Sequence, residues 1–293
     1  MRVFGSVVLL LTLAAPVAVR GPAPLEAAQD SRAAAPRRII SLVPAVTEML
    51  FAIGAGPAVV GVSTFDRYPE QVATRPRVGA LVDPDFERIL TLRPDLVVAY
   101  GSQDDLMQRL ARANIPIYRY RHATLDDILR TIREIGGLVG RLEDADRLAT
   151  RIAADLDAIR ASVAGRPRPR TVILFGREPG SLRGMYASGG YGFVHDMLEI
   201  AGGEDIFADV PRENLQATAE TLLARAPEVI IELRSSGTGW TPERLAAERA
   251  VWRGLPSLPA VRSGRIRILT DESLTVPGPR VAESVRRIAE ALR

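Results

Sequence analysis

The side chains that most often carry catalysis or bind transition metals are scarce in this chain. It has no cysteine and only two histidines, His122 and His195, which lie far apart in the sequence. A bare zinc or manganese site takes several histidines and carboxylates, so this pair does not predict one. No Ser–His–Asp arrangement is evident, and His195 falls within a predicted helix at 193–201, as a surface or capping residue. The sequence therefore indicates binding rather than catalysis, with haem ligation by a tyrosine or histidine left open.

A glycine-rich segment, Gly189-Gly190-Tyr191-Gly192, precedes the same helix. Phosphate-binding loops are also glycine-rich, but this segment lacks the full dinucleotide-binding spacing and does not follow a strand directly. We expect these glycines to serve tight turns rather than a nucleotide.

Two glutamates occupy matching positions in an internal repeat. Glu87 begins the segment 87–98 and Glu220 begins the segment 220–231, and in each a proline, an acidic residue and three aliphatic residues follow in the same order. The repeat predicts two lobes of similar topology with a ligand cleft between them, since small-molecule sites favour such interfaces. Each glutamate also falls in the first turn of a predicted helix, where the helix dipole alone would favour it.

The elements that must position these residues alternate between strand and helix. We expect strands at 38–43, 59–62, 96–100, 116–118, 171–175, 229–231 and 265–269, and helices at 44–53, 87–92, 104–113, 193–201, 220–226 and 279–292. Such alternation predicts an α/β fold with small parallel sheets in two Rossmann-like lobes. An apolar stripe with helical spacing predicts one long helix at 142–164, either a rigid strut between the lobes or an ordinary crossover helix. The lobes then cover 37–141 and 165–293.

The N-terminal segment and the composition indicate where the protein works and which class of partner it has. Residues 1–21 read as a secretory signal peptide with an uncertain cleavage site, and residues 22–36 read as a disordered leader remnant. With no cysteine, neither a disulfide nor a lipid anchor on cysteine is available, so we expect a freely diffusing periplasmic protein. The net charge is +3, all basic residues are arginine, and they alternate with acidic residues, which argues against nucleic acid as a partner.

Five motifs in order resemble one known family. They are Ile39–Glu48, Val60–Ser63 with Tyr68-Pro69, Leu92–Val98, Ala201–Phe207 and Pro277–Arg280. This set, which spans residues 38 to 292, resembles the helical-backbone (class III) periplasmic solute-binding proteins of ABC importers for vitamin B12, haem and iron-siderophores. The cobalamin-binding subgroup is the most similar.

The resemblance implies roles for particular residues. Glu87 and Glu220 match the glutamates, one on each lobe, that pair with arginines on a two-fold ABC permease. The matching ligand-binding positions are Pro44, Phe65, Tyr100, Tyr186, Asn214, Asp271 and Arg280. Leu81 and Asn214 stand where the cobalamin binders would have tryptophan.

We therefore expect a monomeric binding protein, not an enzyme, that has no cofactor of its own and carries a corrinoid to its permease. Haem or a ferric siderophore is the alternative ligand within the family. An α/β enzyme is the alternative from another class.

Overall fold

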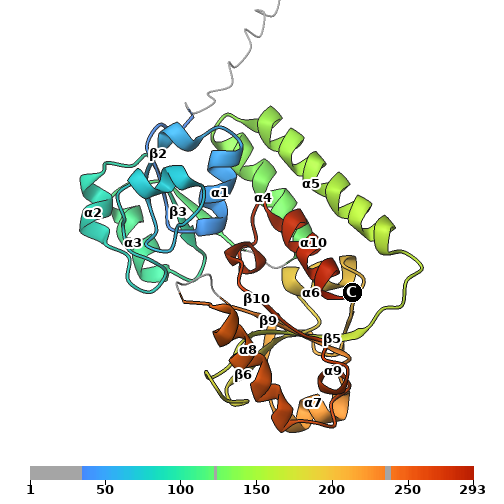
Figure 1. Cartoon of the computed structure of the whole chain (residues 1–293). Helices are drawn as coiled ribbons and strands as arrows, with labels where there is room; N and C mark the ends of the chain where they lie inside the picture. Colours follow the sequence, from blue (N-terminus) through green and yellow to red (C-terminus); the bar gives the residue numbers. More distant parts are fainter. Residues whose placement is uncertain (1–34, 122–123, 235–238) are drawn as a thin grey trace, which may run out of the picture. The chain divides into compact units, whose positions relative to one another are not determined.

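The computed structural model describes residues 35–121, 124–234 and 239–293. The predicted signal peptide, the leader up to residue 34 and His122 lie outside the described residues. Between Ala35 and Arg293 the chain forms two sheets covered by helices (Figure 1). The predicted α/β class with two lobes is confirmed.

The first sheet is parallel throughout, with strand order β2-β1-β3-β4. Its strands are β1 (Ile39–Ser41), β2 (Val59–Val62), β3 (Leu96–Tyr100) and β4 (Ile117–Tyr120), and its helices are α1 (Pro44–Ala52), α2 (Phe86–Thr91) and α3 (Asp104–Arg112). The two central strands, β1 and β3, are buried along almost their whole length, as a parallel sheet covered on both faces requires. Every strand and helix predicted for this lobe is present.

The second sheet has the order β10-β9-β5-β6-β8, with the short β7 paired to β5. Its strands are β5 (Arg170–Gly176), β6 (Met185–Ser188), β7 (Glu204–Asp205), β8 (Asn214–Ala217), β9 (Val229–Leu233) and β10 (Ile266–Leu269). The strands β5, β9 and β10 are parallel, as predicted, but β6 runs antiparallel to both β5 and β8. This sheet is therefore mixed, which corrects the expectation of a purely parallel one. Its helices are α6 (Phe193–Ile200), α7 (Ala219–Arg225), α8 (Pro242–Ala250) and α9 (Pro259–Arg262).

Three further helices lie beside the sheets. The long helix α5 (Leu142–Val163) has the predicted bounds to within a residue, and it packs against α4 (Leu125–Leu138), which the sequence analysis did not predict. The last helix, α10 (Val281–Ala291), packs against both α5 and α6 (Figure 1). Gly136 of α4 lets the helix pair approach closely, because a Cβ there would lie 2.2 Å from that of Ala145.

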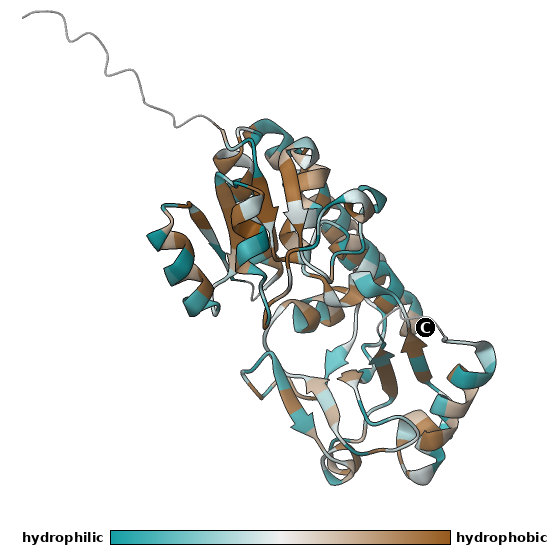
Figure 2. Cartoon of the chain, turned by 90° about the vertical axis from the view of Figure 1, so that its left-hand side faces the viewer, coloured by the Kyte–Doolittle hydropathy of each residue, from teal (hydrophilic) through white to brown (hydrophobic). Residues whose placement is uncertain are grey.

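One hydrophobic core joins the two lobes. Alternate residues of β3 and β5, such as Val98 and Ile173, belong to the same buried cluster, which also takes in the inner faces of α1, α4, α5, α6 and α10. The residues between them, such as Val97 and Val172, face smaller clusters on the outer side of each sheet. In Figure 2 the strands of the first sheet are mostly brown and the helices are banded in teal and brown, as amphipathic helices must be.

The two segments of the internal repeat have the same local structure. In each, a short helix ends at a non-glycine residue with positive φ, Arg93 at 46° and Ala226 at 45°. A proline follows, and then a parallel strand, β3 or β9. A left-handed residue ends the helix by turning the chain, and proline prevents its continuation. Glu87 and Glu220 are each the second residue of their helix, so they are structurally equivalent, as the repeat predicted.

Candidate ligand-binding site

Large apolar side chains that remain exposed gather in two segments of the chain. Those between β2 and α2 are Phe65, Tyr68, Leu81 and Val82, and those between β5 and α6 are Tyr186 and Tyr191. Among the described residues, the other exposed large apolar side chains lie singly on helices: Leu138, Leu142 and Leu223. Scattered exposed leucines are ordinary, whereas a concentration of aromatic side chains in loops is typical of a binding surface.

The loop Ser63–Tyr68, which we call the Phe65 loop, holds an aromatic side chain out in solvent. Phe65 is 65% exposed. Its backbone N–H donates to the Ser63 hydroxyl at 3.1 Å, and Arg77 Nη1 donates to the carbonyls of Ser63 and Asp66, each at 2.9 Å. These bonds fix the backbone of the loop, so Phe65 is presented on a rigid support.

Tyr100, at the end of β3, is linked to the neighbouring loop through Gln103. The Tyr100 backbone N–H donates to Gln103 Oε1 at 3.0 Å, and Gln103 Nε2 donates to the Leu81 carbonyl at 2.9 Å. The Tyr100 ring packs edge-on against Tyr120, with ring centroids 5.9 Å apart. The structure thus brings together two positions singled out from sequence, Tyr100 and Leu81, through a buried glutamine that was not predicted.

Asp66 is a buried carboxylate beneath the same loop. It is fully buried, and neither of its oxygens has a hydrogen-bond partner of standard geometry. Burial raises the pKa of Asp66 from its usual value of 3.8 to about 6, against the opposing influence of the nearby Thr47 hydroxyl, the Ser63 backbone and Arg77. Asp66 in turn adds to the effect of burial in raising the pKa of Tyr100.

We expect Asp66→Asn to stabilise the protein at neutral pH. Because the folded-state pKa is raised, the native state binds more protons than the unfolded state between about pH 4 and pH 6, so stability falls as pH rises through that window. Removing the charge should raise the free energy of unfolding at pH 7 by about 1–3 kcal/mol and flatten its pH dependence. Urea unfolding from pH 4 to pH 8 measures this. An unchanged slope in the variant would contradict it, and Asp157→Asn, on the exposed face of α5, is the control.

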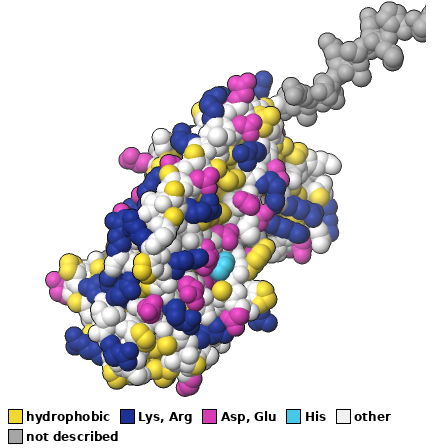
Figure 3. All heavy atoms as spheres, turned by 90° about the vertical axis from the view of Figure 1, so that its right-hand side faces the viewer, with side chains coloured by type: hydrophobic (Ala, Val, Ile, Leu, Met, Phe, Trp, Pro, Cys, Tyr) yellow, Lys and Arg dark blue, Asp and Glu magenta, His cyan; other side chains and the backbone are white. Residues whose placement is uncertain are grey.

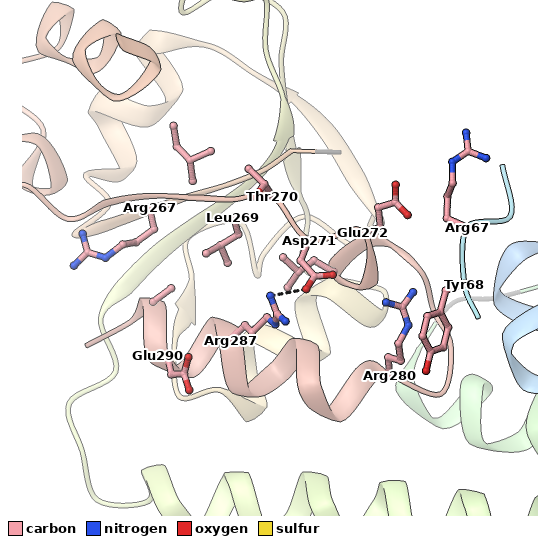
Figure 4. Close-up of a pocket in the computed structure, with 13 residues that line it drawn as sticks. Arg67, Tyr68, Arg267, Leu269, Thr270, Asp271, Glu272, Arg280, Arg287 and Glu290 are labelled. Atoms are coloured by element: carbon pink, nitrogen blue, oxygen red, sulfur yellow. Dashed lines mark ion pairs between the residues drawn. The ribbon is translucent and has the colours of Figure 1, made fainter. Parts of the chain in front are cut away.

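A pocket of about 800 Å³ lies between the two lobes, and we call it the Tyr68 pocket. Arg67 and Tyr68 line it from the first lobe, and residues of β10, the segment 270–274 and α10 line it from the second (Figure 4). Two predicted ligand-binding residues, Asp271 and Arg280, are among them. Both side chains already have partners within the protein. Asp271 accepts a hydrogen bond from the Ser273 N–H at 2.8 Å, which caps the following turn, and it pairs with Arg287 at 2.5 Å.

Arg280 bridges the lobes. Its Nε and Nη2 donate to the two carboxylate oxygens of Glu48, on α1, at 2.9 and 2.5 Å. Its guanidinium carbon lies 4.2 Å from the centroid of the Tyr68 ring (Figure 4). Glu48 is buried, and desolvation raises its pKa although Arg280 opposes the shift. A bidentate pair stacked on an aromatic ring fixes the guanidinium plane, so Arg280 is held in one orientation.

A smaller pocket of about 200 Å³, which we call the Asn214 pocket, lies in the second lobe. Its lining residues are Phe175, Tyr191, Gly192, Phe193, Val194, Glu213, Asn214 and Thr275. The predicted residue Asn214 is thus placed beside Tyr191 and Glu213, neither of which was predicted. Tyr191 had a sequence signal, as an aromatic residue within a glycine-rich turn, whereas a glutamate in a polar loop has none.

The Asn214 pocket adjoins the hydrophobic core that the two lobes share. Phe175 and Phe193, which line the pocket, pack against the same buried cluster as Tyr100 of the first lobe. Tyr100 and the aromatic wall of the Asn214 pocket therefore border one core. Tyr186, which is 53% exposed, and Pro44, at the start of α1, line neither described pocket.

The glycine-rich segment and His195 have structural roles. A Cβ at Gly189 or Gly190 would lie 2.3 or 2.2 Å from a carbonyl oxygen of the segment 208–212, so both glycines allow two backbone segments to touch. His195 Nδ1 lies 2.9 Å from Asp205, a buried carboxylate whose hydrogen bond raises the pKa of the imidazole. In the described part of the chain, no group of three or more histidine or acidic side chains is placed to hold a metal ion.

Comparison with known proteins shows the same fold and related binding proteins. A sequence model for the family described as periplasmic binding protein matches residues 39–273. The vitamin B12-binding protein of Pectobacterium carotovorum is 28% identical, over 88% of this chain and 89% of its own length. That of Salmonella typhimurium is 30% identical, over 88% and 91%.

Two solved structures resemble this one closely. The periplasmic vitamin B12-binding protein of Vibrio cholerae has a TM-score of 0.73 and 26% identity, with 88% of this chain and 96% of that one covered. The periplasmic heme-binding protein of Roseiflexus has a TM-score of 0.71 and 27% identity, with 87% and 97% covered.

Proposed function

Because the chain belongs to the periplasmic binding protein family, we propose that it binds a corrinoid between its lobes and delivers it to an ABC importer. The observation that carries this proposal is the concentration of exposed aromatic side chains in two segments, one from each lobe. A corrin is a large disc with an apolar face, and aromatic walls bury such a face at little entropic cost. The vitamin B12-binding relatives support the choice of ligand.

Haem is the second candidate ligand, with a ferric siderophore behind it. A heme-binding protein of similar identity shares the fold. Tyr68, Tyr186 and Tyr191 are partly exposed, and tyrosine is a known axial ligand of haem iron. Against haem, two of the four arginines that line the Tyr68 pocket are already paired with carboxylates: Arg280 with Glu48 and Arg287 with Asp271.

We further propose that Glu87 and Glu220 dock the protein to its permease. Both are exposed and each is the second residue of its helix, in structurally equivalent segments of the two lobes. Two equivalent carboxylates suit a two-fold partner with matched cationic sites, where they set register and association rate. They differ in one respect: Arg109 lies 3.8 Å from Glu87, whereas hydrogen bonding at the N-terminus of its own helix lowers the pKa of Glu220.

We also propose that residues 1–21 export the chain and that the mature protein works as a monomer in the periplasm, without a partner nucleic acid. Among the described residues, no helix is long and apolar enough to cross a membrane. On the face seen in Figure 3, arginines and acidic side chains intermingle, with no separate basic patch.

Calorimetric titration with cyanocobalamin, haem and a ferric siderophore tests the ligand. We expect tight one-to-one binding of cyanocobalamin. Tyr100→Ala should weaken this binding about tenfold or more, because loss of the aromatic ring removes about 1.4 kcal/mol or more from the free energy of binding. Leu142→Ala, which removes an exposed apolar side chain from the start of α5, is the control and should bind as the wild type does. If haem or the siderophore binds and cyanocobalamin does not, the proposed transport role stands and the proposed ligand is wrong.

A further inference from the structure

The Asn214 pocket is too small for a macrocycle. Its volume of about 200 Å³ corresponds to roughly six or seven water molecules at about 30 Å³ each. A corrin or porphyrin ring cannot enter it, but a side group of a few heavy atoms at the edge of such a ring can. Any contribution of this pocket to selectivity must therefore concern the ligand's peripheral groups.

The polar groups in this pocket form a particular set. Glu213 presents a carboxylate, which only accepts hydrogen bonds, whereas the Asn214 amide both donates and accepts. The Thr275 hydroxyl donates to the Glu272 carbonyl at 3.3 Å and can still accept a hydrogen bond. Phe175 and Tyr191 supply aromatic surface beside them. Among its described lining residues there is no arginine or histidine. An anionic group in the pocket would meet Glu213 and no counter-charge.

A neutral carboxamide matches this set. Its N–H group can donate to Glu213, and its oxygen can accept from the Asn214 amide. A carboxylate of the same size has no N–H to donate and adds a second negative charge next to Glu213, which is unfavourable. The site would therefore accept the amide and reject the acid by repulsion, a common route to specificity.

We propose that the Asn214 pocket is a carboxamide subsite, in which Glu213 selects a primary amide side chain of the ligand over a carboxylate. This inference rests on the proposed function, because corrinoids carry a set of carboxamide side chains at the ring edge whereas haem carries propionates. Its position fits that role, since Phe175 and Phe193 of the pocket pack against the same hydrophobic core as Tyr100. The subsite would distinguish corrinoids from haem, which the aromatic walls alone cannot do.

Cyanocobalamin and its isomeric monocarboxylic acids, in each of which one carboxamide is hydrolysed, are the probes. At pH 7.5 we expect the wild type to bind cyanocobalamin about tenfold more tightly than at least one of the acids, as the loss of one charge-assisted hydrogen bond implies. Glu213→Gln should remove most of this preference, and Glu213→Arg should reverse it for the same isomer. Because Glu213 is exposed, both variants should keep the wild-type thermal unfolding temperature.

The matched control is Glu204→Gln. Glu204 is an exposed glutamate on β7, where it pairs with the first residue of β5, and its neutralisation should leave the preference for the amide over the acid unchanged. Equal ratios of affinity in the wild type, Glu213→Gln and Glu213→Arg would overturn the carboxamide subsite while leaving corrinoid binding intact. Failure of every corrinoid to bind the wild type would instead overturn the proposed function, and the subsite with it.

Discussion

Replacing Arg177 by methionine is expected to lower the free energy of unfolding by about 3–5 kcal/mol. Arg177 is a fully buried arginine at the end of β5, and its Nε lies 3.1 Å from Oε1 of the equally buried Glu232, on β9. Its Nη1 lies 2.9 Å from Glu248, on α8, and also donates to the Ser181 carbonyl at 2.9 Å. Methionine fills much of the volume but leaves two buried carboxylates short of a partner.

The remaining contacts of the network explain why the variant should still fold despite a large loss of stability. Glu232 keeps Trp252 Nε1 at 2.6 Å and Arg234 at 2.5 Å. Chemical denaturation of the variant measures the loss. In a double-mutant cycle, adding Glu232→Leu should recover part of the stability, because the uncompensated charge is then removed.

Arg183→Met is the matched control for Arg177. Arg183 also pairs with a glutamate, Glu178 at 3.1 Å, but its side chain is 81% exposed. Exposed pairs contribute about 0–1 kcal/mol, so this variant should differ little from the wild type. A loss below about 1 kcal/mol for Arg177→Met would show that the buried network contributes no more than an exposed ion pair does.

The double variant Glu87→Ala/Glu220→Ala is expected to lose most ligand uptake while binding ligand as the wild type does. If each glutamate contributes on the order of 1.4 kcal/mol to docking, the single variants should bind the permease about tenfold more weakly and the double variant about a hundredfold. Uptake into proteoliposomes that contain the permease, together with calorimetric ligand binding, separates the two effects.

Glu243→Ala provides an unusually close control for the docking residues. Glu243 is likewise the second residue of a helix, α8, whose Thr241 cap accepts a hydrogen bond from the Arg244 N–H at 3.2 Å. The same hydrogen bonds at the helix N-terminus lower the pKa of Glu243 and of Glu220. Glu243 has no equivalent in the internal repeat. Equal loss of uptake in Glu243→Ala would contradict a specific docking role.

Much of the fold could be predicted because apolar residues recur with helical or strand spacing. The stripe of α5 gave its bounds, and the repeat gave the equivalence of α2 and α7. The helix α4 was not predicted, although its buried residues recur at helical spacing. Gly136 and Gly137, which argue against a helix locally, lie inside it because Gly136 allows close contact with α5. The strands β6 and β8 are short and partly exposed, so they carry no strong pattern.

The contacts of the candidate site residues could not be predicted from the sequence. Family resemblance singled out Phe65, Tyr100, Asn214 and Arg280 as candidates, but it did not indicate what each side chain contacts. The bidentate pair of Arg280 with Glu48 joins residues 232 positions apart, and no local spacing encodes such a partner. Two further polar groups, Gln103 beside Tyr100 and Glu213 in the Asn214 pocket, likewise owe their positions to tertiary contacts.

Because the two lobes share one hydrophobic core, they must fold together although each contains one copy of the internal repeat. The internal repeat divides the chain into two halves of similar local structure, yet the inner face of each sheet is covered by the same cluster, to which α1, α4, α5, α6 and α10 all contribute. Neither half, produced alone, could bury that face. To spread the lobes apart would expose part of this cluster to water, and the free energy required grows with the apolar area exposed. If the proposed permease separates the lobes to release the ligand, it must therefore supply this free energy itself.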